Sequence, residues 1–94
     1  MIRLTRAAEK DLKKFEKGVR DFLVKNLYEI AANPSLGKRL KGVLKKYRSF
    51  HCSFFGTEYR IVYRIETNGD LIIIVMIGTR ENIYKELKRR TNRS

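Results

Sequence analysis

The sequence contains few residues of several types, and each shortage excludes a class of protein. One cysteine among 94 residues excludes an internal disulfide framework, and Cys52 with its neighbour His51 is too little for a metal site. The longest apolar run, residues 71–77, is far too short to span a bilayer, and no signal peptide is evident. We therefore expect a cytoplasmic protein without a cofactor, folded as a single domain over residues 1–94.

Acidic residues are scarce as well. Ten Asp and Glu stand against 22 Lys and Arg, which gives a formal net charge of +12. Such an excess strains a compact monomer by self-repulsion and attracts polyanions. A nucleic acid is the first partner to consider, an acidic protein the second and an anionic membrane surface the third.

Three strands joined by two short turns are predicted over residues 47–55, 58–66 and 71–77. Gly56-Thr57 and Asn68-Gly69 suit the backbone conformations of two-residue hairpin loops. Counting back from these loops predicts the cross-strand pairs Phe54–Tyr59, Cys52–Ile61, Phe50–Tyr63, Ile65–Ile72, Tyr63–Ile74 and Ile61–Met76. Because cross-strand partners share one side of a sheet, these residues form one apolar face, which we interpret as the core face. Cys52 is then a buried, inert thiol.

The opposite face of the first hairpin is largely polar. It holds Ser49, His51, Ser53, Arg60, Val62 and Arg64. A core does not require a histidine and two arginines on one side of a sheet. This face is therefore the candidate site.

The chain before these strands predicts a short strand and a helical hairpin. Ile2 and Leu4 alternate with Arg3, and apolar residues then recur at helical spacing until residue 33, with an interruption at Gly18. Pro34 disfavours helix at the residue before it. The two helices would cover the core face of the sheet. Residues 35–46 carry five basic residues and no acidic one, and we expect a loop there.

Residues 71–77 show no alternation, which indicates a central strand with both faces buried. Its outward residues Ile73, Val75 and Ile77 lie beside Val62 and need a cover. Residues 81–90 could supply one as a short helix, through Ile83 and Leu87; alternatively a partner docks on this patch. The predicted fold is α+β: an N-terminal strand and helical hairpin packed on a mainly antiparallel four-stranded sheet, with a short C-terminal helix or tail.

Several segments, taken in order, resemble the RelE/ParE toxin superfamily of bacterial and archaeal toxin–antitoxin systems. They are the opening strand and helical hairpin, Leu40-Lys41-Gly42, Tyr47-Arg48, Tyr59-Arg60-Ile61-Val62-Tyr63, and Ile77-Gly78-Thr79-Arg80 followed by Tyr84. The resemblance covers nearly the whole chain. It implies a metal-independent endoribonuclease that cleaves mRNA in the ribosomal A site and arrests translation. It also implies a cognate antitoxin that holds the toxin inactive in a hetero-oligomer.

The resemblance also implies roles for single residues. Arg60 and Arg80 match the family's phosphate-binding arginines, and Tyr84 matches its C-terminal tyrosine. The best-known relatives carry two lysines on the second strand. Counting from Leu40 places those positions on Arg48 and Phe50, whereas strand alternation favours Ser49, His51 and Ser53. The general base is thus open, with His51 as our candidate.

Other residues are expected to bind partners. The residues predicted to contact RNA or ribosomal phosphates, without sequence selectivity, are Lys38, Arg39, Lys41, Lys45, Lys46, Arg48, Arg64, Lys88, Arg89 and Arg90. The outer patch of Val62, Ile73, Val75 and Ile77 is expected to bind the antitoxin. Two other functions stay open: a ParE-like toxin of the same fold that inhibits DNA gyrase, and a basic nucleic-acid-binding module without catalysis.

Overall fold

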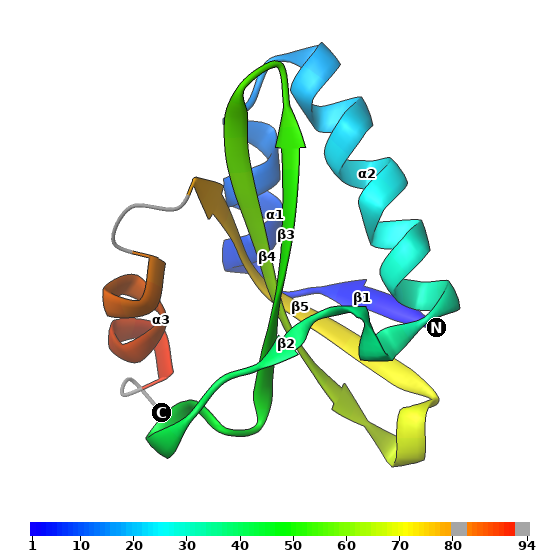
Figure 1. Cartoon of the computed structure of the whole chain (residues 1–94), viewed down its shortest axis with the longest axis vertical. Helices are drawn as coiled ribbons and strands as arrows, with labels where there is room; N and C mark the ends of the chain where they lie inside the picture. Colours follow the sequence, from blue (N-terminus) through cyan, green and yellow to red (C-terminus); the bar gives the residue numbers. More distant parts are fainter. Residues whose placement is uncertain (80–82, 92–94) are drawn as a thin grey trace.

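The computed structural model describes residues 1–79 and 83–91, and in this part of the chain five strands form one sheet (Figure 1). The sheet has the order β1-β5-β4-β3-β2, with β1 (Ile2–Leu4), β2 (Lys38–Arg39), β3 (Tyr47–Phe54), β4 (Thr57–Glu66) and β5 (Leu71–Thr79). Only β1 pairs in parallel, with β5, and the other described pairings are antiparallel. The α+β prediction is confirmed. The predicted loop supplies the fifth strand, because Lys38 and Arg39 pair with Ser49 and Arg48.

Two helices, α1 (Arg6–Lys13) and α2 (Lys17–Ala32), form the predicted helical hairpin. The hydroxyl of Thr5 caps α1 by accepting a hydrogen bond of 3.1 Å from the backbone N–H of Ala8. The helices separate at residues 14–16, so Gly18 lies inside α2 instead of interrupting the hairpin. Single helical turns, η1 (Pro34–Leu36) and η2 (Gly42–Leu44), flank β2.

The first hairpin has a different register from the predicted one. Its turn consists of Phe55 and Gly56, whose φ angles are 50° and 81°. The cross-strand pairs are therefore Phe54–Thr57, Cys52–Tyr59 and Phe50–Ile61, two residues away from the predicted partners. A shift of two residues keeps every side chain on its side of the sheet, so the predicted core face is still correct.

The second hairpin follows the predicted register only part of the way. The pairs Ile65–Ile72 and Tyr63–Ile74 are confirmed, and Asn68 and Gly69 hold positive φ angles in the turn. A β-bulge then makes Val75 an extra residue, so that Val62 pairs with Met76 and Ile61 with Ile77. One extra residue reverses the side that the rest of the strand presents. The predicted pair Ile61–Met76 is therefore wrong: Ile77 faces the helices, and Met76 faces outward.

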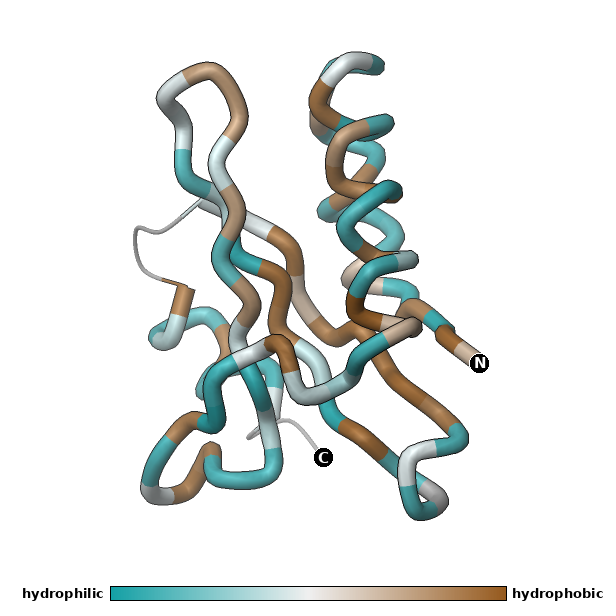
Figure 2. The backbone as a smooth tube through the Cα atoms, turned by 45° about the vertical axis from the view of Figure 1, so that its right-hand side comes forward, coloured by the Kyte–Doolittle hydropathy of each residue, from teal (hydrophilic) through white to brown (hydrophobic). Residues whose placement is uncertain are grey.

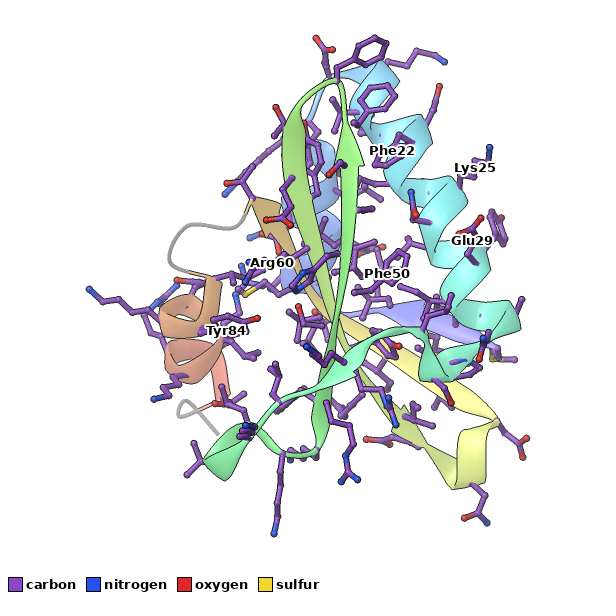
Figure 3. The ribbon with its side chains drawn as sticks, in the orientation of Figure 1. Phe22, Lys25, Glu29, Phe50, Arg60 and Tyr84 are labelled. Atoms are coloured by element: carbon purple, nitrogen blue, oxygen red, sulfur yellow. The ribbon has the colours of Figure 1, made fainter. Side chains whose placement is uncertain are left out.

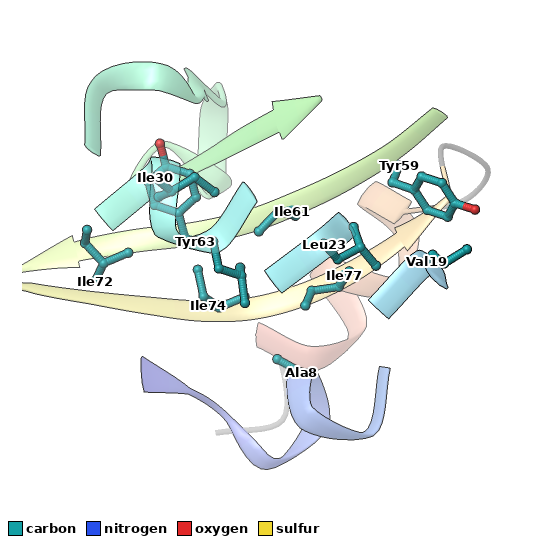
Figure 4. Close-up of a cluster of buried hydrophobic side chains, with 11 residues drawn as sticks. Ala8, Val19, Leu23, Ile30, Tyr59, Ile61, Tyr63, Ile72, Ile74 and Ile77 are labelled. Carbon is teal, nitrogen blue, oxygen red and sulfur yellow. The ribbon is translucent and has the colours of Figure 1, made fainter. Parts of the chain in front are cut away.

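The sheet separates two clusters of buried apolar side chains. The helix-side cluster (Figure 4) comprises Ala8, Val19, Leu23, Leu27, Ile30, Tyr59, Ile61, Tyr63, Ile72, Ile74 and Ile77. The outer cluster comprises Leu44, Tyr47, Val62, Val75, Met76, Ile83 and Leu87. Figure 2 shows hydrophobic residues gathered along the central strands and recurring along the helical hairpin.

The helix α3 (Ile83–Thr91) covers the outer cluster. Its two predicted anchors, Ile83 and Leu87, are 3% and 0% exposed. β5 lies between β1 and β4, as its unbroken apolar run predicted. The layers are therefore helical hairpin, sheet and α3, and the predicted site faces the same way as α3.

Candidate functional site

Arg60 on β4 and Tyr84 on α3 meet over the outer face of the sheet (Figure 3). Nη1 of Arg60 donates a hydrogen bond of 3.0 Å to the Tyr84 hydroxyl, and the guanidinium carbon lies 5.5 Å from the centre of the ring. The Arg60 side chain is 18% exposed, and its buried Nε has no hydrogen-bond partner among the described residues. The structure thus joins two of the predicted catalytic residues, although they lie on different elements.

His51 stands directly across from Arg60, on β3. Glu58 lies beside both residues: its Oε2 is 4.0 Å from Nδ1 of His51, and its Oε1 is 3.6 Å from Nη2 of Arg60. Burial lowers the pKa of His51, and the positive charges of Arg60 and Lys38 lower it further, while Glu58 opposes them. The neutral imidazole is favoured, and that form can accept a proton.

The structure decides between the two alignments of the second strand. Strand alternation is right: Ser49 and His51 share the outer face with Arg60, whereas Arg48 and Phe50 face the helical hairpin. No bulge interrupts the described β3–β4 ladder, and the bulge of this sheet lies in β5. Nη1 of Arg48 donates to the carbonyl oxygens of Gly37, at 2.7 Å, and Ser35, at 3.5 Å. Arg48 therefore holds the turn before β2 and lies away from the candidate site.

Arg90 joins three elements through a network that we call the Asp11–Arg90 clamp. Its Nη1 and Nη2 donate to the two carboxylate oxygens of Asp11 at 3.0 Å each, Nη1 also donates to the Val75 carbonyl at 2.9 Å, and Nε donates to Glu86 at 3.0 Å. Asp11 on α1 is 8% exposed and also accepts a hydrogen bond of 3.0 Å from the Ile77 backbone N–H. A phosphate contact by Arg90 would require this clamp to open.

The clamp provides hydrogen-bond partners for the backbone of β5 beyond the end of β1. The strand β1 pairs with β5 only at Ile72–Ile74, and the backbone of β5 continues beyond it. Buried backbone groups need partners, and here two charged side chains supply them at Val75 and Ile77. The clamp thereby holds α3, and with it Tyr84, against the sheet.

The remaining predicted RNA-contacting residues differ in their exposure and in whether an acidic side chain pairs with them. Arg64 donates to Glu66 at 2.6 Å, and Arg89 pairs with Glu86. Hydrogen bonds from Arg89 and Arg90 hold the pKa of Glu86 at about 2. The exposed members of the set are Lys38, Arg39, Lys41, Lys45, Lys46, Lys88 and Arg89. Arg80, a predicted catalytic residue, lies outside the described residues.

The predicted antitoxin patch is correctly placed except at one position. Val62 and Val75 are buried in the outer cluster, and Ile73 packs against it. Ile77 belongs to the helix-side cluster, because the bulge at Val75 turns it inward, and Met76 takes its place. In this structure α3 covers the patch.

Sequence reasoning missed two residues of the site, Glu58 and Asp11. The signal for Glu58 was its strand parity, which places it on the face of Arg60. Within residues 1–79 and 83–91, no three side chains of metal-binding types lie close enough to hold an ion. Cys52 is half-buried and not fully buried as predicted, and this partial burial raises its pKa to about 11, so the thiol stays protonated at neutral pH, as expected of an inert cysteine.

Comparison with known proteins places this chain in a family. A model described as the ParE-like toxin of type II bacterial toxin–antitoxin systems matches residues 2–88. No curated protein sequence matches. Among the described helices, none has both the length and the apolar character needed to cross a membrane.

Solved structures with the same fold include three toxins. A chain of the toxin–antitoxin complex RelBE2 from Mycobacterium tuberculosis is 27% identical with a TM-score of 0.71, over 85% of this chain and 96% of that one. A mutant of the E. coli toxin RelE in the free state is 22% identical with a TM-score of 0.75, over 96% and 95%. The YoeB/ParE toxin from Agrobacterium tumefaciens is 20% identical with a TM-score of 0.66, over 84% and 96%.

Proposed function

This chain belongs to the ParE-like toxins of type II toxin–antitoxin systems, within the RelE/ParE superfamily, and from that premise we propose that it is a ribosome-dependent endoribonuclease that cleaves mRNA in the A site. The observation that carries the proposal is the hydrogen bond of 3.0 Å between Arg60 and Tyr84, with His51 directly across from Arg60. An imidazole, a guanidinium and a phenol on one face can supply the base, the cation and the acid of a phosphodiester cleavage.

Each group has a part in the proposed reaction. His51 removes the proton from a ribose 2′-OH, and the resulting 2′-oxygen attacks the adjacent phosphorus. Arg60, with Arg80 as a second proposed cation, stabilises the negative charge that builds on the crowded phosphorane. The bond to the 5′-oxygen breaks, and the Tyr84 hydroxyl donates a proton to that leaving oxygen. The products are a 2′,3′-cyclic phosphate and a free 5′-OH.

Basic side chains on the same face of the sheet support RNA as the substrate. A groove of about 510 Å³ lies between α3 and the end of β4, and its lining includes Lys46, Arg64 and Arg90 together with the acidic Glu66. Lys38 adds positive charge beside His51, from the neighbouring strand. These side chains can hold the phosphates that flank the cleaved bond, without selecting a base.

Substitution of the pair tests the proposal. Arg60→Ala should lower the rate of mRNA cleavage on ribosomes by about tenfold to a thousandfold, since it removes a cation that stabilises the transition state. Tyr84→Phe keeps the ring, removes the hydroxyl and should cost at least about tenfold. Arg6→Ala is the matched control, because it removes the same charge from an exposed position at the start of α1. Mapping mRNA 5′ ends in a translation extract measures all three.

The extract and a supercoiling assay with purified gyrase together separate this activity from gyrase inhibition. Gyrase inhibition is the alternative function that the ParE-like description of the family model suggests. Cleaved mRNA with unchanged supercoiling by purified gyrase supports the proposal. Intact mRNA with inhibited supercoiling would assign the protein to the gyrase-inhibiting toxins instead. Intact mRNA and unaffected gyrase, with RNA binding retained, would leave a basic binding module.

An antitoxin is the proposed partner, since related toxins have been solved in complex with one. We propose that a segment of the antitoxin displaces α3 and covers Val62, Val75 and Met76. That displacement would carry Tyr84 away from Arg60 and break the Asp11–Arg90 clamp. An acidic antitoxin surface would also neutralise part of the charge of +12. Weakening the contacts of Asp11 that hold α3 tests this displacement.

A further inference from the structure

The hairpin of β3 and β4 ends in a phenylalanine that its local structure disfavours (Figure 1). Phe55 has a φ angle of 50°, in the left-handed region, and is 93% exposed. A two-residue turn with positive φ at both positions prefers Asn-Gly, and a bulky residue there is an outlier. Neither backbone preference nor burial explains a phenylalanine at this position, and such outliers cluster at functional sites.

Two further aromatic rings connect Phe55 to the helical hairpin. The Phe55 ring meets Phe54 edge-on, with ring centres 4.6 Å apart, and Phe54 stacks on Phe22 of α2, also at 4.6 Å. These contacts tie the turn to the helical hairpin. Phe55 therefore presents its exposed ring from a supported position, which reduces the entropy lost when a partner binds.

The surroundings of the turn favour an anionic partner. The connection between α1 and α2 lies at the same end of the molecule (Figure 1), and its Phe15 contacts Tyr59 at 5.5 Å between ring centres. Residues 13–21, which span this connection and the helix ends beside it, hold Lys13, Lys14, Lys17 and Arg20 against Glu16 and Asp21, and Lys17 pairs with Asp21 at 2.8 Å. An exposed ring and a net positive charge at one end of the molecule can bind nucleic acid, with a base on the ring and phosphates on the lysines.

We propose that Phe55 stacks on an unpaired nucleobase of RNA, at a site separate from the catalytic pair. Arg60 lies three residues along β4 from Thr57, where the strand leaves the turn, or roughly 10 Å along the hairpin. The base belongs either to the single strand being cleaved or to ribosomal RNA. The inference rests on the proposed function only in taking RNA as the partner.

The turn itself offers a sharp test, because stability and binding should move in opposite directions. Phe55→Asn gives the turn its preferred sequence and should raise Tm by about 4–8 °C. It should weaken RNA binding about 5- to 100-fold, since it removes one stacked ring. Phe55→Trp should retain the affinity. Val43→Ala, at an apolar position that is 82% exposed in η2, is the matched control and should change neither quantity.

Two probes distinguish the sources of the base. Fluorescence anisotropy with a 2′-O-methylated single-stranded oligoribonucleotide reports the strand, and co-sedimentation with ribosomes lacking mRNA reports ribosomal RNA. Weaker binding of Phe55→Asn to either probe supports stacking and identifies the source. Unchanged binding to both, no binding by the wild type, or full rescue by Phe55→Leu would overturn it. Neither probe is cleaved, so the result is independent of whether Arg60 and Tyr84 catalyse cleavage.

Discussion

The two faces of the sheet are covered in different ways. The helical hairpin α1–α2 covers one face and packs on a continuous cluster that includes Ile61, Tyr63 and Ile74. The nine-residue helix α3 covers the other face, with Ile83 and Leu87 as its buried residues. A helix of this length is marginal by itself, so its place depends on tertiary contacts. We therefore infer that the helix-side face is a permanent core, whereas α3 is a cover that a partner can displace.

The candidate site lies on the face that α3 covers. Arg60 and His51 are part of the sheet, while Tyr84 is carried by α3. The geometry of the pair therefore depends on how firmly α3 is held. The difference between the faces predicts that stability and the proposed activity depend on different contacts in this fold.

Matched substitutions on the two faces of the sheet should produce the largest changes in stability and in hydrogen exchange. Ile61→Ala on the helix side should lower the free energy of unfolding by about 2–5 kcal/mol, because a fully buried side chain is lost from the core. Leu87→Ala removes a similar volume from an equally buried site, but should mainly release α3. Urea denaturation measures the first effect. Hydrogen exchange measures the second, as lost protection in residues 83–91 with protection kept in β4 and β5.

A single result would remove the distinction between the faces. If Leu87→Ala lowered the urea midpoint as much as Ile61→Ala and exposed all amides equally, α3 would be part of the permanent core. Val43→Ala, at an exposed position, serves as the control in both measurements.

The helix-side face could be predicted from the sequence because alternation determines it. The register of the first hairpin was wrong by two residues, yet Phe50, Cys52 and Phe54 stayed on the predicted side. The bulge at Val75 could not be predicted. It falls in an unbroken apolar run, where no polar residue marks the change of side, and it moved Ile77 from one cluster to the other.

The outer face was predicted less completely, for two physical reasons. Asp11 lies among lysines on a short helix, so the sequence gives no sign that its carboxylate is buried against Arg90. The sequence predicts Phe55 in a strand, because Gly56 suits the first position of the turn, whereas the structure places both residues in the turn. The pairing of Arg60 with Tyr84 was anticipated only through the resemblance to a family, since no local pattern relates residues on separate elements.

Weakening the clamp should have the next largest effect and should sharpen the difference between the faces. Asp11→Asn removes a charge that Arg90 contacts twice, and should loosen α3 by about 1.5–3 kcal/mol. If the antitoxin displaces α3, the same change should tighten antitoxin binding, because displacement then costs less. Hydrogen exchange over residues 83–91 and the antitoxin Kd measure the two effects.

A surface ion pair provides the control for this experiment. Asp21→Asn breaks the exposed pair with Lys17 on α2 and should change either quantity very little. A looser α3 with unchanged antitoxin affinity would show that the antitoxin leaves α3 in place. Unchanged exchange over residues 83–91 would show that the clamp does not hold the helix.

The smallest expected effect is a shift in pH dependence, and it tests whether His51 makes the outer face catalytic. Burial and Arg60 lower the pKa of His51, so the neutral base should persist below its ordinary pKa of about 6.5, and cleavage should fall only at lower pH. Glu58→Gln removes the charge that raises this pKa, and should move the fall in activity to still lower pH. His51→Gln should lower the rate and abolish this limb of the profile. Single-turnover cleavage between about pH 5 and 8 measures all three proteins.

The folded state also resists protonation of His51, so the stability that this residue contributes should decline as pH falls through about 6.5. An acidic limb that is the same in the wild type and both variants would remove His51 from the mechanism and assign the base to another group, for which Lys38 is the nearest candidate on this face.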